Sequence, residues 1–218
     1  MKAILFLLAA ARAASAETVR YSINWPSGLS LGEAVLESVV DGSETRHRFT
    51  LEASIPGFAV IDRFASRATL ERCSLELNKQ FQHGKRQGEE TTVFHLAAGV
   101  AERRTKDGGR SELPIPACAR DALTYLDWLR AELRLGRLPG PQTIYFGAPY
   151  QIALKFGGAQ PVLAGGKARP ADRIEVTVKG PASETRFELF FSQDPSRRLL
   201  MARVPFPLGS FTMEIAEE

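Results

Sequence analysis

The sequence predicts a mainly β (α+β) protein: a strongly curved antiparallel sheet, or a half-open barrel, with one long helix packed on it. Three observations support this prediction. Segments in which polar and apolar residues alternate recur along the chain, Gly-, Pro- and Asp-containing turns separate them, and one segment has an apolar stripe at helical spacing. Strands joined in order by short turns pair antiparallel by default, and a helix then covers one face.

The N-terminus has the three parts of a secretory signal peptide. A positive start at Met1-Lys2 precedes an apolar run from Ala3 to Ala11, and a small-x-small ending follows at Ala14 and Ala16. We therefore expect cleavage between Ala16 and Glu17. The alternative is a membrane anchor, which needs about 20 apolar residues and so a much longer run than this one.

Cleavage would divide the chain into a signal peptide, residues 1–16, and a single β-rich domain, residues 17–218. The domain keeps 26 of the 28 basic residues and all 25 acidic residues, because the signal contains Lys2 and Arg12 and no acid. A net charge this close to zero does not favour nucleic-acid binding. No other apolar stretch predicts a transmembrane segment. We expect a periplasmic protein with no cofactor and no nucleic-acid partner.

Cys73 and Cys118 are the two cysteines of the chain. In an oxidising compartment they most simply form one disulfide, with Cα atoms within about 7 Å. It would pin the helix to the sheet and stabilise the fold by about 4 kcal/mol. Two buried free thiols are the alternative. A metal pair is less favoured, because no His or Cys stands at short ligand spacing from either cysteine.

Alternation and turn residues place strands throughout the first half of the domain. Residues 60–70 also suit a helix face, but the turns around them favour a strand. Residues 101–105 are expected to continue the preceding strand past Gly99, and 106–109 to form a loop. The expected strands are 18–25, 29–39, 46–55, 60–70, 73–81, 90–96 and 101–105.

One helix is expected from Ala119 to Leu135, ended by Gly136. Asp121 in its first turn, and Arg130 and Arg134 near its end, match the helix dipole. The apolar stripe should be buried against the sheet; it contains Leu123, Leu126, Leu129 and Leu133.

Tyr125 and Trp128 lie on the two flanks of that stripe. If the sheet is wide, one of them should border a gap that the helix leaves open. Such a gap would be a ligand entrance, whereas filled flanks would favour a protein without a small ligand.

The rest of the chain returns to strands, expected at 143–146, 150–156, 174–179, 185–191, 199–204 and 211–215. They are expected to be separated by turns at 157–158, 165–166, 180–181 and 194–196. The turn Asp194-Pro195-Ser196-Arg197-Arg198 is interpreted as structural, because a carboxylate before proline accepts hydrogen bonds from the following amides.

Four segments resemble a known family: YSINWPSGLSLGEA (Tyr21 to Ala34), CSLELNKQFQHGKR (Cys73 to Arg86), CARDALTYLDWLRAELRLGR (Cys118 to Arg137), and Asp194 to Gly209. They are similar to exported bacterial proteins catalogued as domain of unknown function 3108. The resemblance implies export across the inner membrane of Gram-negative bacteria and a β-rich fold. It implies no activity, substrate or catalytic residue.

No catalytic or metal motif stands out in the sequence. His47, His83 and His95 are not at ligand spacing from one another or from other ligands, and no nucleophile motif is present. We therefore predict no catalytic residue and no metal ligand. A basic cluster could meet lipid phosphates or an anionic glycan, although a charged surface offset by nearby acids is favoured; the cluster contains Lys85, Arg86, Arg103, Arg104, Lys106 and Arg110.

Three functions remain in competition. The favoured one is a non-catalytic periplasmic binding or carrier module for an apolar or lipid-like envelope ligand, because one helix cannot cover a wide curved sheet and the uncovered concave side would be apolar. The alternative is a structural or interaction protein of the cell envelope. The second alternative is an enzyme with an unrecognised site. The ligand-binding residues stay unknown at this point.

Overall fold

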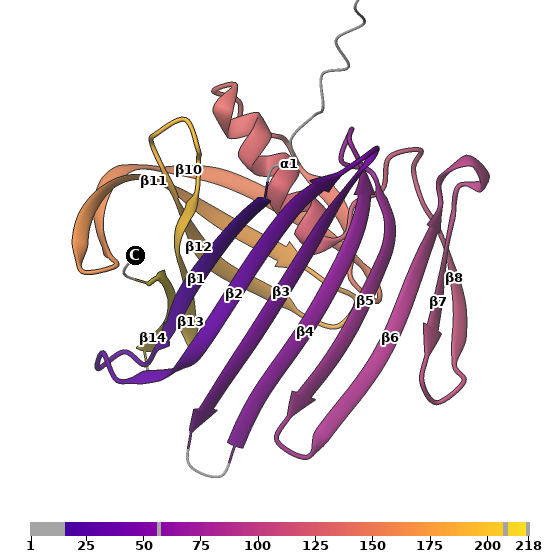
Figure 1. Cartoon of the computed structure of the whole chain (residues 1–218), viewed down its shortest axis with the longest axis horizontal. Coiled ribbons are helices and arrows are strands. Elements are labelled where there is room, and N and C mark those ends of the chain that lie inside the picture. Colours follow the sequence, from indigo (N-terminus) through magenta and orange to yellow (C-terminus); the bar gives the residue numbers. More distant parts are fainter. Residues whose placement is uncertain (1–15, 56–57, 207–208, 217–218) are drawn as a thin grey trace, which may run out of the picture.

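The computed structural model describes residues 16–55, 58–206 and 209–216, which form 14 strands of one antiparallel sheet and one α-helix, α1 (Ala122–Arg134) (Figure 1). This confirms the predicted fold class. The strands are β1 (Ala16–Asn24), β2 (Ser30–Asp41), β3 (Glu44–Ile55), β4 (Phe58–Thr69), β5 (Ser74–His83), β6 (Arg86–His95), β7 (Val100–Thr105), β8 (Arg110–Pro114), β9 (Gln142–Tyr145), β10 (Pro149–Ala164), β11 (Lys167–Lys179), β12 (Glu184–Ser192), β13 (Leu199–Phe206) and β14 (Gly209–Ile215); a short 3-10 turn, η1 (Leu96–Ala98), precedes β7.

The sheet is a meander whose sequence ends meet in its middle. Its order is β8-β7-β6-β5-β4-β3-β2-β1-β14-β13-β12-β11-β10-β9, so β1 pairs with β14 and the edges are β8 and β9. The chain leaves the sheet after one edge, passes through α1, and re-enters at the other edge (Figure 1). The helix packs on β3 and β4 and also contacts the edge strand β9.

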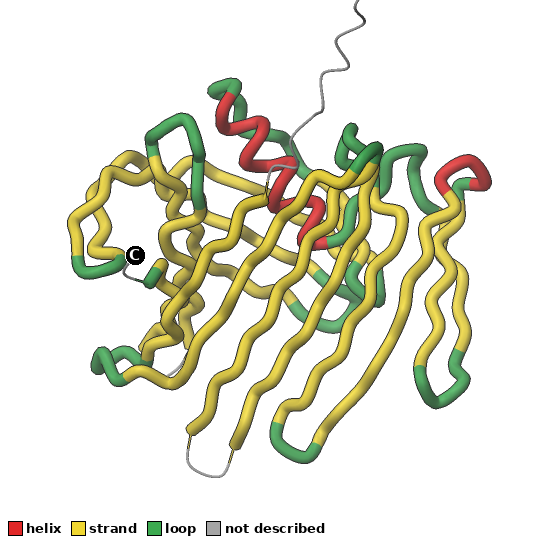
Figure 2. The backbone as a smooth tube through the Cα atoms, viewed as in Figure 1, coloured by secondary structure: helices red, strands yellow, loops and turns green. Residues whose placement is uncertain are grey.

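The sheet is not closed into a barrel, but a short segment before the helix joins its two halves. The Ser74 amide donates to the Ala119 carbonyl at 2.8 Å, and the Tyr145 amide donates to the Arg120 carbonyl at 2.9 Å. These bonds link the start of β5 to β9. Figure 2 shows α1 at one end of the coiled sheet, opposite the end at which β4 begins and a turn joins β5 to β6. We call these the helix end and the hairpin end.

The main core lies between the two halves of the coil and under the helix. It combines inward-facing residues of β1, β2 and β10–β14 with the buried residues Leu123, Tyr125, Leu129 and Leu133 of α1. A second, smaller core fills the space beside the joining segment, around Leu77, Phe94, Ala101, Ile115, Ala119 and Tyr145. The two cores thus hold the helix and the short segment before it in place.

The helix begins later than its sequence pattern predicts. It starts at Ala122 rather than Ala119, because Asp121 caps it by accepting from the amides of Leu123 and Thr124. Cys118 therefore precedes the helix rather than beginning it. The predicted stop is correct, since Gly136 adopts a φ of 69° directly after the end of the helix.

Three strand predictions are wrong. Residues 101–105 do not continue the preceding strand, because the chain reverses at Gly99 (φ 67°) and β7 pairs back on β6. Residues 110–114, for which no strand was predicted, form the edge strand β8. Gly157–Gly158 is a bulge inside the long strand β10, not a break, so the hairpin of β10 and β11 turns only at Gly165–Gly166.

The predicted signal peptide falls almost wholly outside the described residues, which begin at Ala16 in β1. The expected cleavage between Ala16 and Glu17 stays a prediction. Within the described ranges, no helix is long and apolar enough to cross a membrane.

Candidate functional site

Strand alternation defines one inner face that runs from the helix end to the hairpin end. On β3 it includes His47, Phe49 and Leu51, and the register pairs these with Ser66, Phe64 and Asp62 of β4. The rings of Phe49 and Phe64 stack with their centroids 6.0 Å apart, and both rings pack on the main core. Every second residue of each strand therefore points into the coil.

Burial falls steadily along this inner face. Near the helix end His47, Ser66 and Leu77 are at most 3% exposed. Farther along the same strands the inward residues are partly exposed although they point into the coil, and Phe58, at the hairpin end, is 44% exposed. The partly exposed inward residues of β3–β5 are Phe49, Leu51, Ala53, Val60, Asp62, Phe64, Lys79, Phe81 and His83. The interior is thus filled beneath α1 and accessible toward the hairpin end.

The strands across the coil continue the apolar lining. Their inward residues also pack on the main core while staying partly exposed, and the register aligns Leu154 with Val176 and Val176 with Phe187. This group contains Leu154, Val178, Phe187, Leu189 and Met213. Partly exposed apolar side chains on a concave surface are typical of sites for apolar ligands.

One polar pair interrupts this lining at the hairpin end. His83 Nε2 lies 2.9 Å from Asp62 Oδ1, and the ring centroids of His83 and Phe81 are 5.4 Å apart. The Arg86 guanidinium lies over the Phe81 ring at 5.7 Å from its centroid. Asp62 shares its cross-strand row with Leu51 and Phe81, so these groups all face the inner side.

The helix end is held by a buried polar cluster around Asp121, which is 0% exposed. Its Oδ2 accepts from Ser66 Oγ and Ser74 Oγ, each at 2.6 Å, and from Thr124 Oγ1 at 2.9 Å. The carboxylate therefore joins α1 to β4 and β5 as well as capping the helix. Because all of its partners are satisfied and buried, we interpret the cluster as structural.

Arg130 fixes the other side of the helix. It donates to both carboxylate oxygens of Glu17, at 2.8 and 3.0 Å, and to the carbonyls of Ser196 and Arg197, each at 3.1 Å. Burial raises the pKa of Glu17, but the hydrogen bonds and charge of Arg130 outweigh this and hold it below its usual range. The turn of residues 194–198 is thus structural, and Asp194 also accepts from the Ser196 amide at 2.7 Å.

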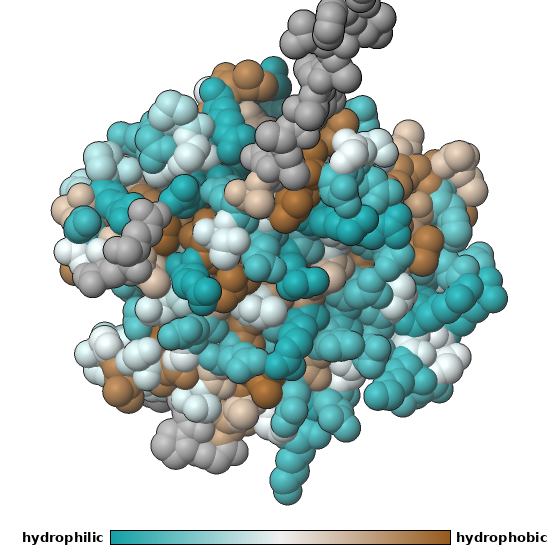
Figure 3. All heavy atoms as spheres, in the orientation of Figure 1, coloured by the Kyte–Doolittle hydropathy of each residue, from teal (hydrophilic) through white to brown (hydrophobic). Residues whose placement is uncertain are grey.

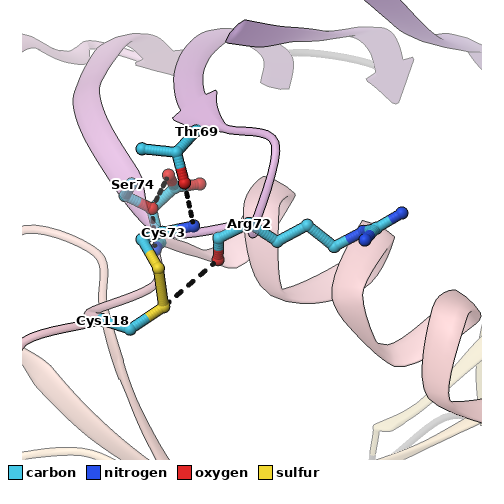
Figure 4. Close-up of a disulfide and its surroundings, with 6 residues drawn as sticks. Thr69, Arg72, Cys73, Ser74 and Cys118 are labelled. Carbon is cyan, nitrogen blue, oxygen red and sulfur yellow. Dashed lines mark hydrogen bonds between the residues drawn. A yellow bond between two sulfur atoms is a disulfide. The ribbon is translucent and has the colours of Figure 1, made fainter. Parts of the chain in front are cut away.

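The disulfide joins Cys73 to Cys118 with Cα atoms 4.7 Å apart (Figure 4). It links the turn before β5 to the segment that leads into α1. The Cys73 amide donates to Thr69 Oγ1 at 3.3 Å, so the turn is also held from the strand before it. The bridge therefore reinforces the attachment of the helix end to β4 and β5.

A second buried charge cluster lies beside the β9–β10 turn. Lys79 Nζ donates to Glu90 Oε1 at 2.7 Å and lies 4.0 Å from the centroid of the Phe146 ring, while Arg103 donates to Glu90 Oε2. Burial raises the pKa of Glu90, but Lys79 and Arg103 outweigh this and lower it overall. Both oxygens of Glu90 are occupied, which favours a structural role.

The outer face of β2–β6 is hydrophilic (Figure 3). Ion pairs such as Arg46–Asp41, at 3.0 Å, cross neighbouring strands there. A depression of about 460 Å³ lies on this face over Ala65, among charged residues. The outer face thus contrasts with the apolar inner face of the same strands.

The three histidines lie apart and form no joint site. His47 is buried on the inner face, with Nδ1 2.9 Å from Ser38 Oγ, His83 pairs with Asp62, and His95 is exposed. Burial lowers the pKa of His47, so it is neutral at pH 7. Within the described residues, no three His, Cys, Asp or Glu side chains are placed to hold a metal ion.

The basic cluster of the sequence separates into two groups. Arg103, Arg104, Lys106 and Arg110 each have a carboxylate partner. Lys85 and Arg86, in and after the β5–β6 turn, have none within the part of the chain that the structure describes. The favoured prediction, a charged surface offset by acids, therefore describes the first group only.

The expected gap beside the helix stays a prediction at Trp128, which is partly exposed, whereas Tyr125 is buried. Tyr125 is 6% exposed, and its ring centroid lies 5.6 Å from that of Trp128. The Arg120 guanidinium covers Trp128 at 4.2 Å from its centroid. The partly exposed inward residues described above lie toward the hairpin end.

The polar residues of the hairpin end were not predicted from the sequence, although alternation in β4 gives a signal for them. In β4 the alternation places Asp62 on the same face as Val60 and Phe64. A carboxylate in the middle of an apolar face needs a partner, and a search for one would have pointed to His83. The pairing itself depends on the β4–β5 register, which the sequence does not give.

Among solved structures, the chain is similar to a beta-barrel-like protein of domain of unknown function DUF1849 from Brucella abortus. The TM-score is 0.59 at 9% identity, with 92% of this chain and 95% of that chain covered. A second structure, described as a "putative lipoprotein" from Parabacteroides distasonis, has a TM-score of 0.35 at 8% identity and covers 92% of this chain and 93% of that chain. The first likeness shows a shared fold.

No curated protein sequence matches the chain. The model of one protein family matches it over residues 20–216, which include β2 to β14 and the second half of β1. The chain therefore belongs to the family described as "Protein of unknown function (DUF3108)".

Proposed function

We propose that this protein is a non-catalytic periplasmic binding or carrier module, which holds an apolar or lipid-like envelope ligand inside the coiled sheet. The observation that carries the proposal is the fall in burial along the inner face. Inward residues are closed off beneath α1, whereas apolar inward residues such as Leu51 and Phe187 keep solvent access. Exposed apolar surface on a concave wall costs free energy in water, and a ligand would cover it.

The rigid helix end fits this function. The disulfide, the Asp121 cluster and Arg130 hold α1 against the sheet from three sides. The hairpin end is therefore the natural ligand entrance. The predicted signal peptide supports an envelope location, because an exported carrier meets lipid-like molecules there.

A cavity-filling variant tests the proposal. In Ala53→Phe a large ring would occupy the accessible interior near Val60, its partner on β4. We expect the variant to keep its stability and to lose at least about tenfold in affinity for an apolar fluorescent probe, because the ring would exclude the probe. The matched control is Ala65→Phe, which places the same ring in the outer depression over β4.

Probe binding that survives Ala53→Phe and disappears in Ala65→Phe would overturn the interior site. A folded wild-type protein that binds no apolar probe would contradict the carrier function and favour the alternative, an interaction protein of the envelope. A specific observation supports that alternative: β8 is an edge strand with mostly exposed residues. Edge strands can pair with another chain, although Arg110, Glu112 and Pro114 on this one oppose indiscriminate pairing.

A further inference from the structure

Among the described residues, the two members of the basic cluster that lack a carboxylate partner lie side by side in the sequence. Of the six residues in the basic cluster, four have carboxylate partners, and the remaining two, Lys85 and Arg86, follow one another at the β5–β6 turn. That turn lies at the hairpin end, where the interior becomes accessible.

The Arg86 side chain belongs to the inner side of the sheet. Arg86 is the cross-strand partner of His83, which shares the inner face with Phe81 and pairs with Val60 of β4. Its guanidinium lies over the Phe81 ring rather than over an outward residue. A cation therefore borders the apolar lining instead of pointing away from it.

Two glycines allow this arrangement. Gly88 of β6 is the cross-strand partner of Phe81. A Cβ at Gly88 would lie 2.6 Å from the Phe81 ring, so the absence of a side chain there allows the ring to lie over β6. A Cβ at Gly84 would lie 2.8 Å from the Phe58 ring, which packs against the same turn. Two aromatic rings and two cations thus share one rim.

The one acid that the described residues place on the inner face of this rim is already engaged. Asp62 Oδ1 lies 2.9 Å from His83 Nε2, and its side chain is 15% exposed. Arg86 has no carboxylate partner among the described residues. The rim therefore carries an excess of positive charge beside an apolar interior.

We infer that the ligand is an anionic amphiphile whose carboxylate or phosphate head is bound at Arg86, with Lys85 adding charge, and whose hydrocarbon chain lies on the inner face. The inference rests on the proposed binding function and adds the chemical class of the ligand. A guanidinium forms strong charge-assisted hydrogen bonds with either kind of head group, and the apolar lining accepts the chain.

The test compares four amphiphiles with the same twelve-carbon chain, each below its micelle concentration: laurate, dodecyl phosphate, monolauroylglycerol and dodecyltrimethylammonium. We expect the full-length mature protein to bind at least one anion about tenfold more tightly than the neutral monoglyceride, by calorimetry. The anion with the higher affinity distinguishes a carboxylate from a phosphate head. Arg86→Gln should abolish the preference and leave monoglyceride affinity unchanged.

Arg104→Gln is the matched control, because Arg104 belongs to the same basic cluster but pairs with Glu102. It should keep the preference for anions. Equal affinity for anionic and neutral amphiphiles, a preference for the cation, or binding only to anionic vesicles and not to monomers would each overturn the inference while an apolar probe still binds. If neither the probe nor any amphiphile binds, the proposed function itself fails.

Discussion

Arg130 of the helix and Glu17 of the first strand form a two-bond ion pair across 113 positions of the sequence. The Arg130 side chain is 5% exposed; the Glu17 carboxylate balances its charge, and two carbonyls of the 194–198 turn accept its other hydrogen bonds. One side chain thus connects the helix, the start of the sheet and the β12–β13 connection.

Arg130→Ala should therefore destabilise the protein strongly. It removes both hydrogen bonds to the partly buried Glu17 carboxylate and the bond to the Arg197 carbonyl, although Arg198 still lies 3.3 Å from Glu17. Breaking comparable buried pairs costs about 3–5 kcal/mol. Chemical denaturation measures the free energy of unfolding. Arg134→Ala is the control, because exposed Arg134 donates one bond to the same Ser196 carbonyl and should change stability by less than about 0.5 kcal/mol. Equal effects would contradict the anchoring role.

The leucine stripe of the helix is not uniformly buried. Leu129 is 0% exposed, whereas Leu126 is partly exposed at the edge of the main core. Leu129→Ala should cost about 2–5 kcal/mol of unfolding free energy, and Leu126→Ala distinctly less, because less apolar surface is lost from contact. A larger loss at Leu126 in denaturant titrations would show that the helix is rotated from the position described.

The disulfide should stabilise the folded state by reducing the conformational entropy of the unfolded chain. Cys73 and Cys118 are 45 residues apart, and the chain-entropy estimate for such a loop is about 4 kcal/mol. The double variant Cys73→Ser, Cys118→Ser should lose about that amount, and reductant should lower the stability of wild type but not of the variant. An unchanged denaturation midpoint in the double variant would refute this prediction.

Stability should depend on pH through His47. Burial lowers its pKa in the folded state below the ordinary 6.5, so the unfolded chain takes up a proton first as the pH falls. The contribution of His47 to the free energy of unfolding should therefore be complete above pH 6.5 and should decrease below it. This decrease should begin at a higher pH than the titration of the Glu17 and Glu90 carboxyls. His47→Gln should flatten this region of the profile, whereas replacing exposed His95 should not. An unaltered profile in His47→Gln would count against this origin.

The fold class was predictable because local pattern encodes it. Alternation in segments such as residues 46–55 gives strands, and the leucine spacing of residues 123–133 gives a helix. The pairing of β1 with β14 was not predictable, because no turn connects them. The bulge at Gly157–Gly158 was mistaken for a break, since paired glycines mark turns and bulges alike.

The candidate site was less accessible to prediction than the fold. A gap was expected beside Tyr125 or Trp128; those rings pack together, and the partly exposed inward residues of β3–β5 lie toward the hairpin end. Which end of a coiled sheet is filled depends on where the crossing helix lies, and that depends on three-dimensional contacts such as Arg130 with Glu17. The basic cluster was visible in the sequence, but only the structure separates the paired cations from Arg86.

Native mass spectrometry of the protein purified from its own periplasm tests the carrier function most directly. We expect the spectrum of the wild-type protein to show the added mass of one bound amphiphile. The added mass should be absent from Ala53→Phe and present in Ala65→Phe. Release and fragmentation of that mass should identify a hydrocarbon chain with an anionic head. Wild-type protein that is folded, processed and free of any bound small molecule, and that takes up none of the amphiphiles offered afterwards, would contradict the account.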